Sequence, residues 1–68
     1  MNVLMLGSGP NVTEAAAWHR GQFDVIVAIN NAWRVRDDWD YLVHPSDFPE
    51  ERQPEALKEG QQVITYEA

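Results

Sequence analysis

Four short apolar runs are spaced along the 68-residue chain, and each of them predicts a β-strand. They cover residues 3–6, 25–29, 41–43 and 63–66. The first two runs are continuous, without polar alternation, which is typical of strands buried on both faces of a parallel sheet. The last run alternates more and predicts an edge strand.

The segment between the first two runs has the signals of a helix. Asn11 is placed to cap its N-terminus, and Glu14 follows three residues later, as in a capping box. Gly21 is placed to end this helix. The resulting strand–helix–strand order predicts a βαβ unit with a right-handed connection.

Two further helical segments are expected before the last strand. Residues 32–34 predict one turn of helix. After the third run, Asp47 is a candidate N-cap, with Glu50 three residues further on. Pro54 interrupts any long helix there, so we expect an irregular turn and then a helix over about residues 54–59.

This order of elements is that of an α/β protein. We expect three layers with a mostly parallel, four-stranded sheet, equivalent to half of a Rossmann-like doubly wound fold. Residues 1–68 then form a single domain that is a minimal or truncated version of that fold. A complete fold of this type has two such halves, so we also expect that copies of the chain can associate as a homo-oligomer.

Charge and composition narrow the classes of partner. The formal net charge is −6 and the pI is about 4.5, whereas non-specific binding to DNA or RNA requires a basic surface. No run is long enough to span a membrane, and the N-terminus lacks a signal-peptide pattern. The chain has no cysteine, which fits a cytoplasmic protein. Any bound anion must be held by local geometry, because the overall charge repels it.

A glycine-rich turn directly after the first run is the strongest candidate for a ligand site. Open α/β sheets bind ligands outside the carboxyl ends of their strands, which is where this turn lies. Glycines permit close approach of the backbone to a phosphate, and the N-terminus of a following helix offers unpaired N–H groups. The alternative is a tight connector without a ligand. The expected nucleotide contacts in this turn are Gly7, Ser8, Gly9, Pro10 and Asn11.

This turn differs from the dinucleotide fingerprint in two ways. Val12 stands where that motif has its third glycine, and no acidic residue ends the second run to hold a ribose. Asn30 and Asn31 stand at the end of the second run, where the fingerprint has its acidic residue. An NAD site is therefore disfavoured, and no cofactor is expected.

Asn30 and Asn31 should leave the sheet beside the glycine turn. Asparagine both donates and accepts hydrogen bonds, which suits a ribose, a base or a phosphate. The alternative, equally compatible with the sequence, is that both residues only form a turn or cap the next short helix.

A third group, His44, Ser46 and Asp47, follows the third run at the same edge of the predicted sheet. These side chains could face the same pocket, and histidine exchanges protons near neutral pH. The capping pattern favours the alternative, in which His44 ends a strand and Asp47 caps a helix. His19, His44 and Asp47 do not have a recognised metal-binding spacing, so no metal site is assigned.

Trp18, Trp33 and Trp39 are many for so short a chain. Tryptophans of a small domain are expected to fill its core. Trp33 and Trp39 lie among polar residues, and for them a subunit interface is an equal alternative.

Several of these motifs together resemble a known family. The segments 3–10 (VLMLGSGP), 23–31 (FDVIVAINN) and 44–47 (HPSD) resemble the N-terminal part of bacterial family 42 sialyltransferases and the related 6-hydroxymethylpterin diphosphokinase-like domains. Those proteins open with a strand, a G-x-G-P-S turn, a helix and a second strand that ends in asparagine.

In the sialyltransferases, that turn and that asparagine line the pocket for a cytidine-monophosphate sugar. The resemblance therefore implies nucleotide contacts at residues 7–10 and at Asn30 or Asn31. It covers residues 3–47 and does not include the segment that carries the family's catalytic histidine. His44 does not match that histidine and does not inherit its role.

Three functions follow from these patterns. The first is a nucleotide or nucleotide-sugar binding module, related to glycosyltransferases and not catalytic on its own. The second is a self-associating structural or protein-interaction domain that kept the fold and lost the ligand. The third and least supported is a small enzyme with an active site across a dimer interface, using His44 and Asp47, because no general base has a recognisable partner.

Overall fold

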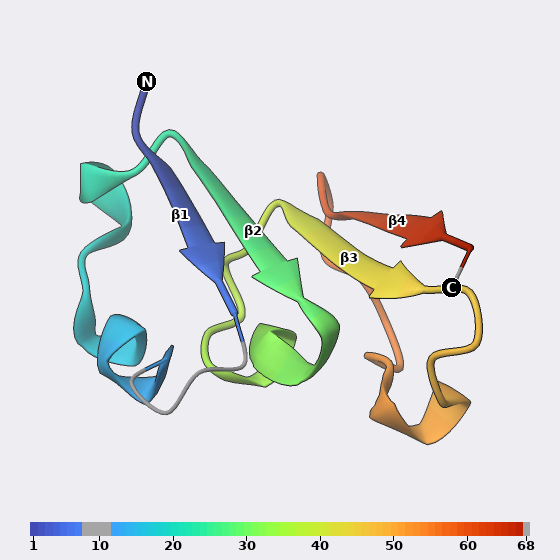
Figure 1. The fold of residues 1–68 in the computed structure, drawn as a ribbon. Helices are drawn as coiled ribbons and strands as arrows, with labels where there is room; N and C mark the ends of the chain where they lie inside the picture. The colour runs from blue at the N-terminus through green and yellow to red at the C-terminus, as the bar shows by residue number, and fades with distance from the viewer. Residues whose placement is uncertain (8–11, 68) are drawn as a thin grey trace.

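The centre of the computed structural model, which describes residues 1–7 and 12–67, is a sheet of four parallel strands (Figure 1). The strands lie side by side in the order of the sequence. The α/β class and the parallel four-stranded sheet expected from the sequence are confirmed, and each apolar run forms one strand. The strands are β1 (Val3–Leu6), β2 (Val25–Ile29), β3 (Tyr41–Pro45) and β4 (Gln62–Tyr66).

The described connections between these strands contain short 3-10 turns: η1 (Val12–Ala17), η2 (Arg20–Gln22), η3 (Asn30–Arg34) and η4 (Glu50–Arg52). None of these helical elements is long and apolar enough to cross a membrane, in the part of the chain that the structure describes. The turn of helix expected at residues 32–34 is confirmed within η3.

The single helix expected between β1 and β2 is instead two 3-10 turns. The chain is extended at His19, with φ −69° and ψ 129°, so η1 and η2 are separate and Gly21 lies inside η2. A helix of so few residues has little stability of its own, because nucleation is costly and few hydrogen bonds follow it. The proposed cap, Asn11, lies outside the described residues.

The helix expected over residues 54–59 is wrong, because this segment is an irregular loop that ends in a turn with Gly60 at φ 87°. Contacts with a distant part of the chain hold the loop: Gln61 Nε2 donates to the carbonyl oxygens of Asp37 at 2.9 Å and of Trp39 at 3.0 Å. Asp47 is not a helix cap either. The turn η4 begins after Pro49, and no side chain caps it.

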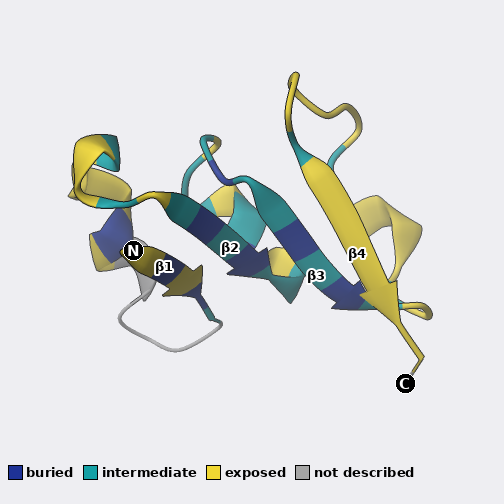
Figure 2. Cartoon of the chain, turned by 90° about the horizontal axis from the view of Figure 1, so that it is seen from above, coloured by how far each residue is buried: buried dark blue, intermediate teal, exposed yellow. Residues whose placement is uncertain are grey.

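One face of the sheet carries the core. Buried residues alternate along β1, β2 and β3 with residues that are half-buried or exposed (Figure 2). The connections cover this face because right-handed crossovers between successive neighbouring strands all pass over the same side. The described residues therefore supply two of the three expected layers. The core consists of Leu4, Leu6, Ile26, Ala28 and Leu42 from the sheet, with Ala15, Ala32 and Trp39 from the connections.

The three tryptophans have different environments. Trp39 is 3% exposed and belongs to the core, which confirms the core expectation and excludes its interface alternative. Trp33 is half-buried and packs against the same core. Trp18 is 46% exposed and lies near Phe23, with ring centroids 6.2 Å apart.

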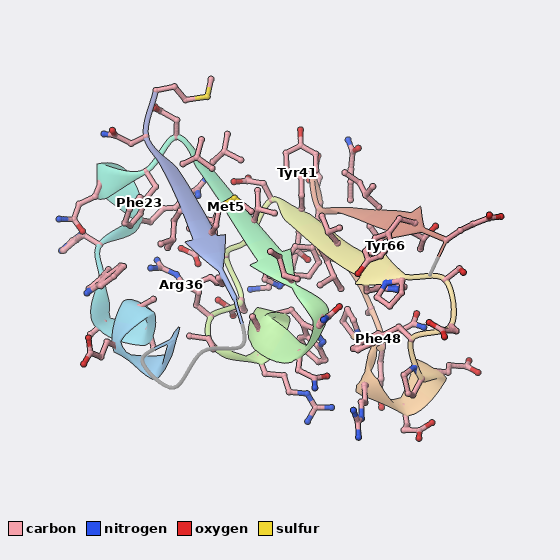
Figure 3. The ribbon with its side chains drawn as sticks, in the orientation of Figure 1. Met5, Phe23, Arg36, Tyr41, Phe48 and Tyr66 are labelled. Atoms are coloured by element: carbon pink, nitrogen blue, oxygen red, sulfur yellow. The ribbon has the colours of Figure 1, made fainter. Side chains whose placement is uncertain are left out.

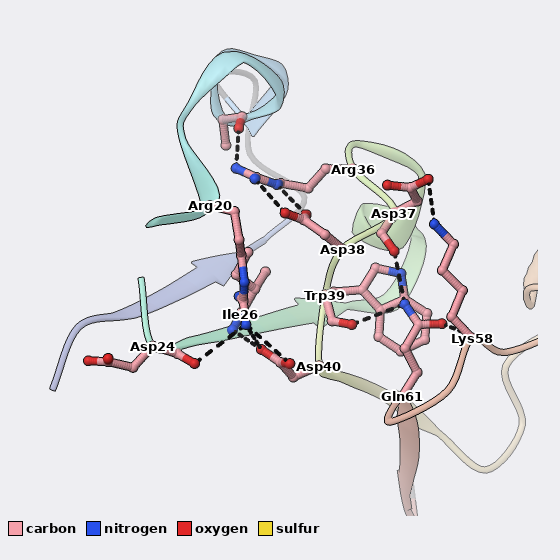
Figure 4. A network of polar contacts seen from close by, with 11 residues as sticks. Arg20, Asp24, Ile26, Arg36, Asp37, Asp38, Trp39, Asp40, Lys58 and Gln61 are labelled. Carbon is pink, nitrogen blue, oxygen red and sulfur yellow. Dashed lines mark hydrogen bonds and ion pairs between the residues drawn. The ribbon is translucent and has the colours of Figure 1, made fainter. Parts of the chain in front are cut away.

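Ionic contacts hold the segment before β3 to its surroundings (Figure 4). Arg36 pairs with Asp38 through two hydrogen bonds of 2.6 and 2.7 Å, and its Nη1 donates to the carbonyl oxygen of Ala15 at 3.0 Å. This last contact satisfies a carbonyl of η1 and ties that turn to the loop. The hydrogen bonds from Arg36 hold the pKa of Asp38 below its usual range.

Candidate functional site

The carboxyl ends of the parallel strands lie at one edge of the sheet, and the predicted site residues that the structure describes lie along it (Figure 1). Gly7 directly follows β1, and Asn30 directly follows β2 as the first residue of η3. His44 is the fourth residue of β3. The sheet thus brings to one edge three positions that are far apart in the sequence, as its parallel topology requires.

The glycine turn is described at its first residue. Gly7 is half-buried, and a Cβ atom added there would meet no heavy atom within 4 Å. The protein's own packing therefore does not require glycine at this position, and the space is open to an approaching group. The other predicted contacts of the turn, Ser8, Gly9, Pro10 and Asn11, lie outside the described residues.

Asn30 has two features that are costly for stability. Its φ is +55°, in the left-handed region that asparagine tolerates better than most residues. Its Oδ1 is buried and accepts no hydrogen bond from any described residue. A buried acceptor without a donor costs about 1–3 kcal/mol. Such costs concentrate at functional sites, where a ligand or a conformational requirement offsets them.

His44 is buried on the covered face, with 3% of its surface exposed. Its ring lies 5.0 Å from the ring of Phe48, which lies between the end of β3 and η4 (Figure 3). Nδ1 lies 2.8 Å from the carbonyl oxygen of Pro45, and a carbonyl only accepts, so Nδ1 carries the proton. Packing and this hydrogen bond therefore fix both the orientation and the tautomer of His44.

Ser46 and Asp47 are exposed in the turn after β3, whereas His44 is buried. The backbone N–H of Ser46 donates to the carbonyl oxygen of Tyr66 at 2.7 Å and continues the contact between β3 and β4. Among the described residues, no hydrogen bond joins the side chains of His44, Ser46 and Asp47. The structure does not assemble them into one group.

A hollow at the same edge has a lining that the sequence patterns did not indicate: Asn31, Arg34 and Arg52. Trp33 connects its two arginines. The guanidinium carbon of Arg34 lies 5.1 Å from the centroid of the Trp33 ring, and the indole Nε1 donates to the carbonyl oxygen of Arg52 at 2.8 Å. No sequence pattern singled out these arginines, because acidic residues lie close to both: Asp37 follows three residues after Arg34, and Glu51 directly precedes Arg52.

A wider hollow lies at the opposite edge of the sheet, by the amino ends of β1 and β2. None of its lining residues has a titratable side chain. Its lining residues are Met1, Asn2, Val3, Trp18, Gln22 and Phe23.

No three histidine, aspartate or glutamate side chains gather into a metal site within the described residues. The fold and the edge define a class: a parallel-sheet α/β domain with polar residues at the carboxyl ends of its strands. Comparisons with protein-family models, with curated proteins and with solved structures found no match.

Proposed function

We propose that this chain is a nucleotide-binding module whose ligand lies across the carboxyl ends of the strands. The observation that carries the proposal is Asn30, with its positive φ and its buried, unpaired Oδ1 at the end of β2. A base or ribose offers N–H and O–H donors that can complete such an acceptor.

Gly7 supports the same location for the ligand. Gly7 follows β1 and Asn30 follows β2, and these two strands are neighbours, with Leu6 opposite Ala28. The open space at its missing Cβ allows a ligand to approach the backbone closely. Ligands of open α/β sheets bind at this edge.

The resemblance of residues 3–47 to family 42 sialyltransferases makes cytidine nucleotides and cytidine-monophosphate sugars the first ligands to test. In this proposal the module binds such a ligand, is related to glycosyltransferases, and is not catalytic on its own. His44 supports the absence of catalysis, because its ring packs against Phe48 and its Nδ1 proton is donated to the carbonyl oxygen of Pro45.

Replacement of Asn30 by glycine tests this proposal. Glycine adopts the same positive φ without strain and removes the unpaired acceptor, so the variant should be at least as stable as the unaltered chain. Binding of a cytidine nucleotide, measured by calorimetry, should weaken about tenfold or more, because a ligand hydrogen bond is lost. Gln22→Ala, an exposed change at the opposite edge, is the control and should bind as the unaltered chain does. Equal binding by Asn30→Gly would contradict the proposal.

A second candidate function, self-association, is favoured by the uncovered face of the sheet. The exposed fractions of Val3, Met5, Ile64 and Tyr66 lie between 47% and 59%. The register aligns apolar residues across this face, with Met5 opposite Val27 and Val43 opposite Ile64. Parallel sheets are normally covered on both faces, so a partner surface is expected here.

A second copy of the chain is the partner that fits this face best. The side chains aligned there carry no charge, so two chains of net charge −6 can meet without bringing like charges into contact. The chain exposes 4805 Å², whereas a monomer of 7.8 kDa exposes about 4,400 Å². The uncovered face consists of four strands of only four or five residues each, so it is small beside the roughly 800 Å² that each partner contributes to a standard interface. The expected dimer is therefore weak.

A further inference from the structure

Trp33 holds two arginines from different parts of the chain beside one hollow. Arg34 lies over its ring at 5.1 Å, and Arg52 is fixed through its carbonyl oxygen, which accepts a 2.8 Å hydrogen bond from the indole. Arg34 ends η3, and Arg52 ends η4. The half-buried indole thus contacts the side chain of Arg34 and the backbone of Arg52, and both arginines are exposed.

These two arginines differ from the other cations of the chain. Arg20, Arg36 and Lys58 each pair with an aspartate, at 3.0, 2.6 and 2.7 Å. Arg34 and Arg52 take part in no ion pair among the described residues. In a chain of net charge −6, the lysine and arginine side chains that lack an ion pair among the described residues thus line the same hollow.

Acidic residues of η4 lie close in the sequence but line another hollow. Glu50 and Glu51 precede Arg52 directly, and together with Gln53 and Glu55 they surround a separate depression. The hollow between Arg34 and Arg52 has a neutral third member, Asn31, whose amide also donates hydrogen bonds. The lining of this hollow is therefore made of donors and positive charge.

We propose that Asn31, Arg34 and Arg52 form an oxyanion site that takes a phosphate group of a small ligand. Guanidinium groups bind phosphate through paired, charge-assisted hydrogen bonds, and two of them neutralise the charge of a phosphate. Asn31 directly follows Asn30, so the site adjoins the proposed nucleotide position. The assignment of this phosphate to a nucleotide rests on the proposed function, whereas the oxyanion site itself does not.

This site predicts a preference for more highly charged ligands. Inorganic pyrophosphate should bind more tightly than inorganic phosphate, and cytidine diphosphate more tightly than cytidine monophosphate. The attraction acts between exposed groups, so added salt should weaken it. Chloride at matched ionic strength should not reproduce the binding.

The test is a titration of the full chain with pyrophosphate, followed by NMR of the arginine Nε–H groups and the Trp33 indole N–H. The signals of Arg34, Arg52 and Trp33 should shift together and saturate. Arg34→Gln and Arg52→Gln should each weaken binding about fivefold or more. Lys58→Gln removes an equally positive, exposed side chain and should leave binding unchanged. Absence of saturable shifts, or equal loss in Lys58→Gln, would overturn the oxyanion site.

Cytidine nucleotides separate the two proposals. If pyrophosphate shifts the arginines but no nucleotide shifts Gly7 or Asn30, the oxyanion site stands and the nucleotide function fails. If nucleotides shift Gly7 and Asn30 while neither they nor pyrophosphate shift Arg34 and Arg52, the oxyanion site fails and the nucleotide function stands. The altered side chains are exposed, so each variant should fold as the unaltered chain does. The backbone amide spectrum of each variant checks this.

Discussion

Two hydrogen bonds join Asp40, the residue before β3, to Ile26 of β2. The Ile26 N–H donates to the Asp40 carboxylate at 2.8 Å, and the Asp40 N–H donates to the Ile26 carbonyl oxygen at 2.8 Å. The same carboxylate accepts a 3.0 Å hydrogen bond from Arg20 (Figure 4). The Asp40 side chain therefore joins β2, the start of β3 and the end of the first connection. It lies by the amino ends of the strands, at the edge of the sheet opposite the proposed site.

Replacement of Asp40 by alanine should destabilise the fold strongly. It leaves the buried N–H of Ile26 without an acceptor and Arg20 without its partner, which should cost about 2–3 kcal/mol. A core this small supplies only about 3–5 kcal/mol, so urea denaturation should show a chain close to its unfolding midpoint. Asp40→Asn retains an acceptor oxygen and should cost less than Asp40→Ala. Equal stability of Asp40→Ala and the unaltered chain would show that this contact is unimportant.

Acid should destabilise the chain in part through Asp38. Hydrogen bonds from Arg36 lower its folded-state pKa, so the unfolded chain binds the proton more readily. The stabilisation is therefore complete above the ordinary aspartate pKa, about 4, and is lost as the pH falls through the lower folded value.

Urea denaturation at several acidic pH values measures this contribution. The free energy of unfolding of the unaltered chain should fall with pH more steeply than that of Asp38→Asn, which cannot titrate at this position. Asp37, whose pKa is lowered by Lys58, is fully exposed, and Asp37→Asn should change the pH dependence much less. Identical pH profiles for Asp38→Asn and the unaltered chain would refute the assignment.

Gly7→Ala should separate folding from ligand binding. The added methyl group meets nothing within 4 Å and Gly7 does not have a positive φ, so the free energy of unfolding should change by less than about 1 kcal/mol. If a ligand approaches the backbone at Gly7, its affinity should fall about tenfold, because the methyl group overlaps it. A variant that folds and binds cytidine nucleotides normally would place the ligand elsewhere.

Self-association should depend on the uncovered face of the sheet. Met5→Glu and Ile64→Glu place a charge on this face, at the first and the last strand of the sheet. Tyr41 and Tyr66 also project from it (Figure 3). In sedimentation velocity over a range of concentrations, the unaltered chain should show weak, concentration-dependent dimerisation that both variants abolish. Gln22→Glu adds the same charge away from this face and should still dimerise. A chain that stays monomeric at millimolar concentration would exclude this function.

Strand positions could be predicted from the sequence because apolar side chains fix them locally. The run 25–29 is rich in β-branched residues and forms β2 within those bounds. Its continuity predicted burial on both faces, and Val25, Val27 and Ile29 are only half-buried on the face that the described residues leave uncovered. The run thus indicates a second covering layer, which the proposed dimer would supply.

The connections could not be predicted because distant contacts decide them. The loop over residues 53–61 has a helical signal at Pro54, yet Gln61 binds the backbone of Asp37 and Trp39 instead. Arg34 and Arg52 meet only through Trp33, across a separation in sequence that no spacing rule covers. Asn30 was singled out for its chemistry, whereas its positive φ and its unpaired oxygen required the structure.

The most direct test of the central claim is an amide NMR titration of the chain with a panel of nucleotides and nucleotide sugars. The nucleotide-binding account predicts saturable shifts at Gly7, Asn30 and Asn31, strongest for a cytidine ligand, with no shifts at Gln22 and Phe23 by the opposite edge. A well-folded sample in which no member of the panel shifts Gly7 or Asn30 would contradict it.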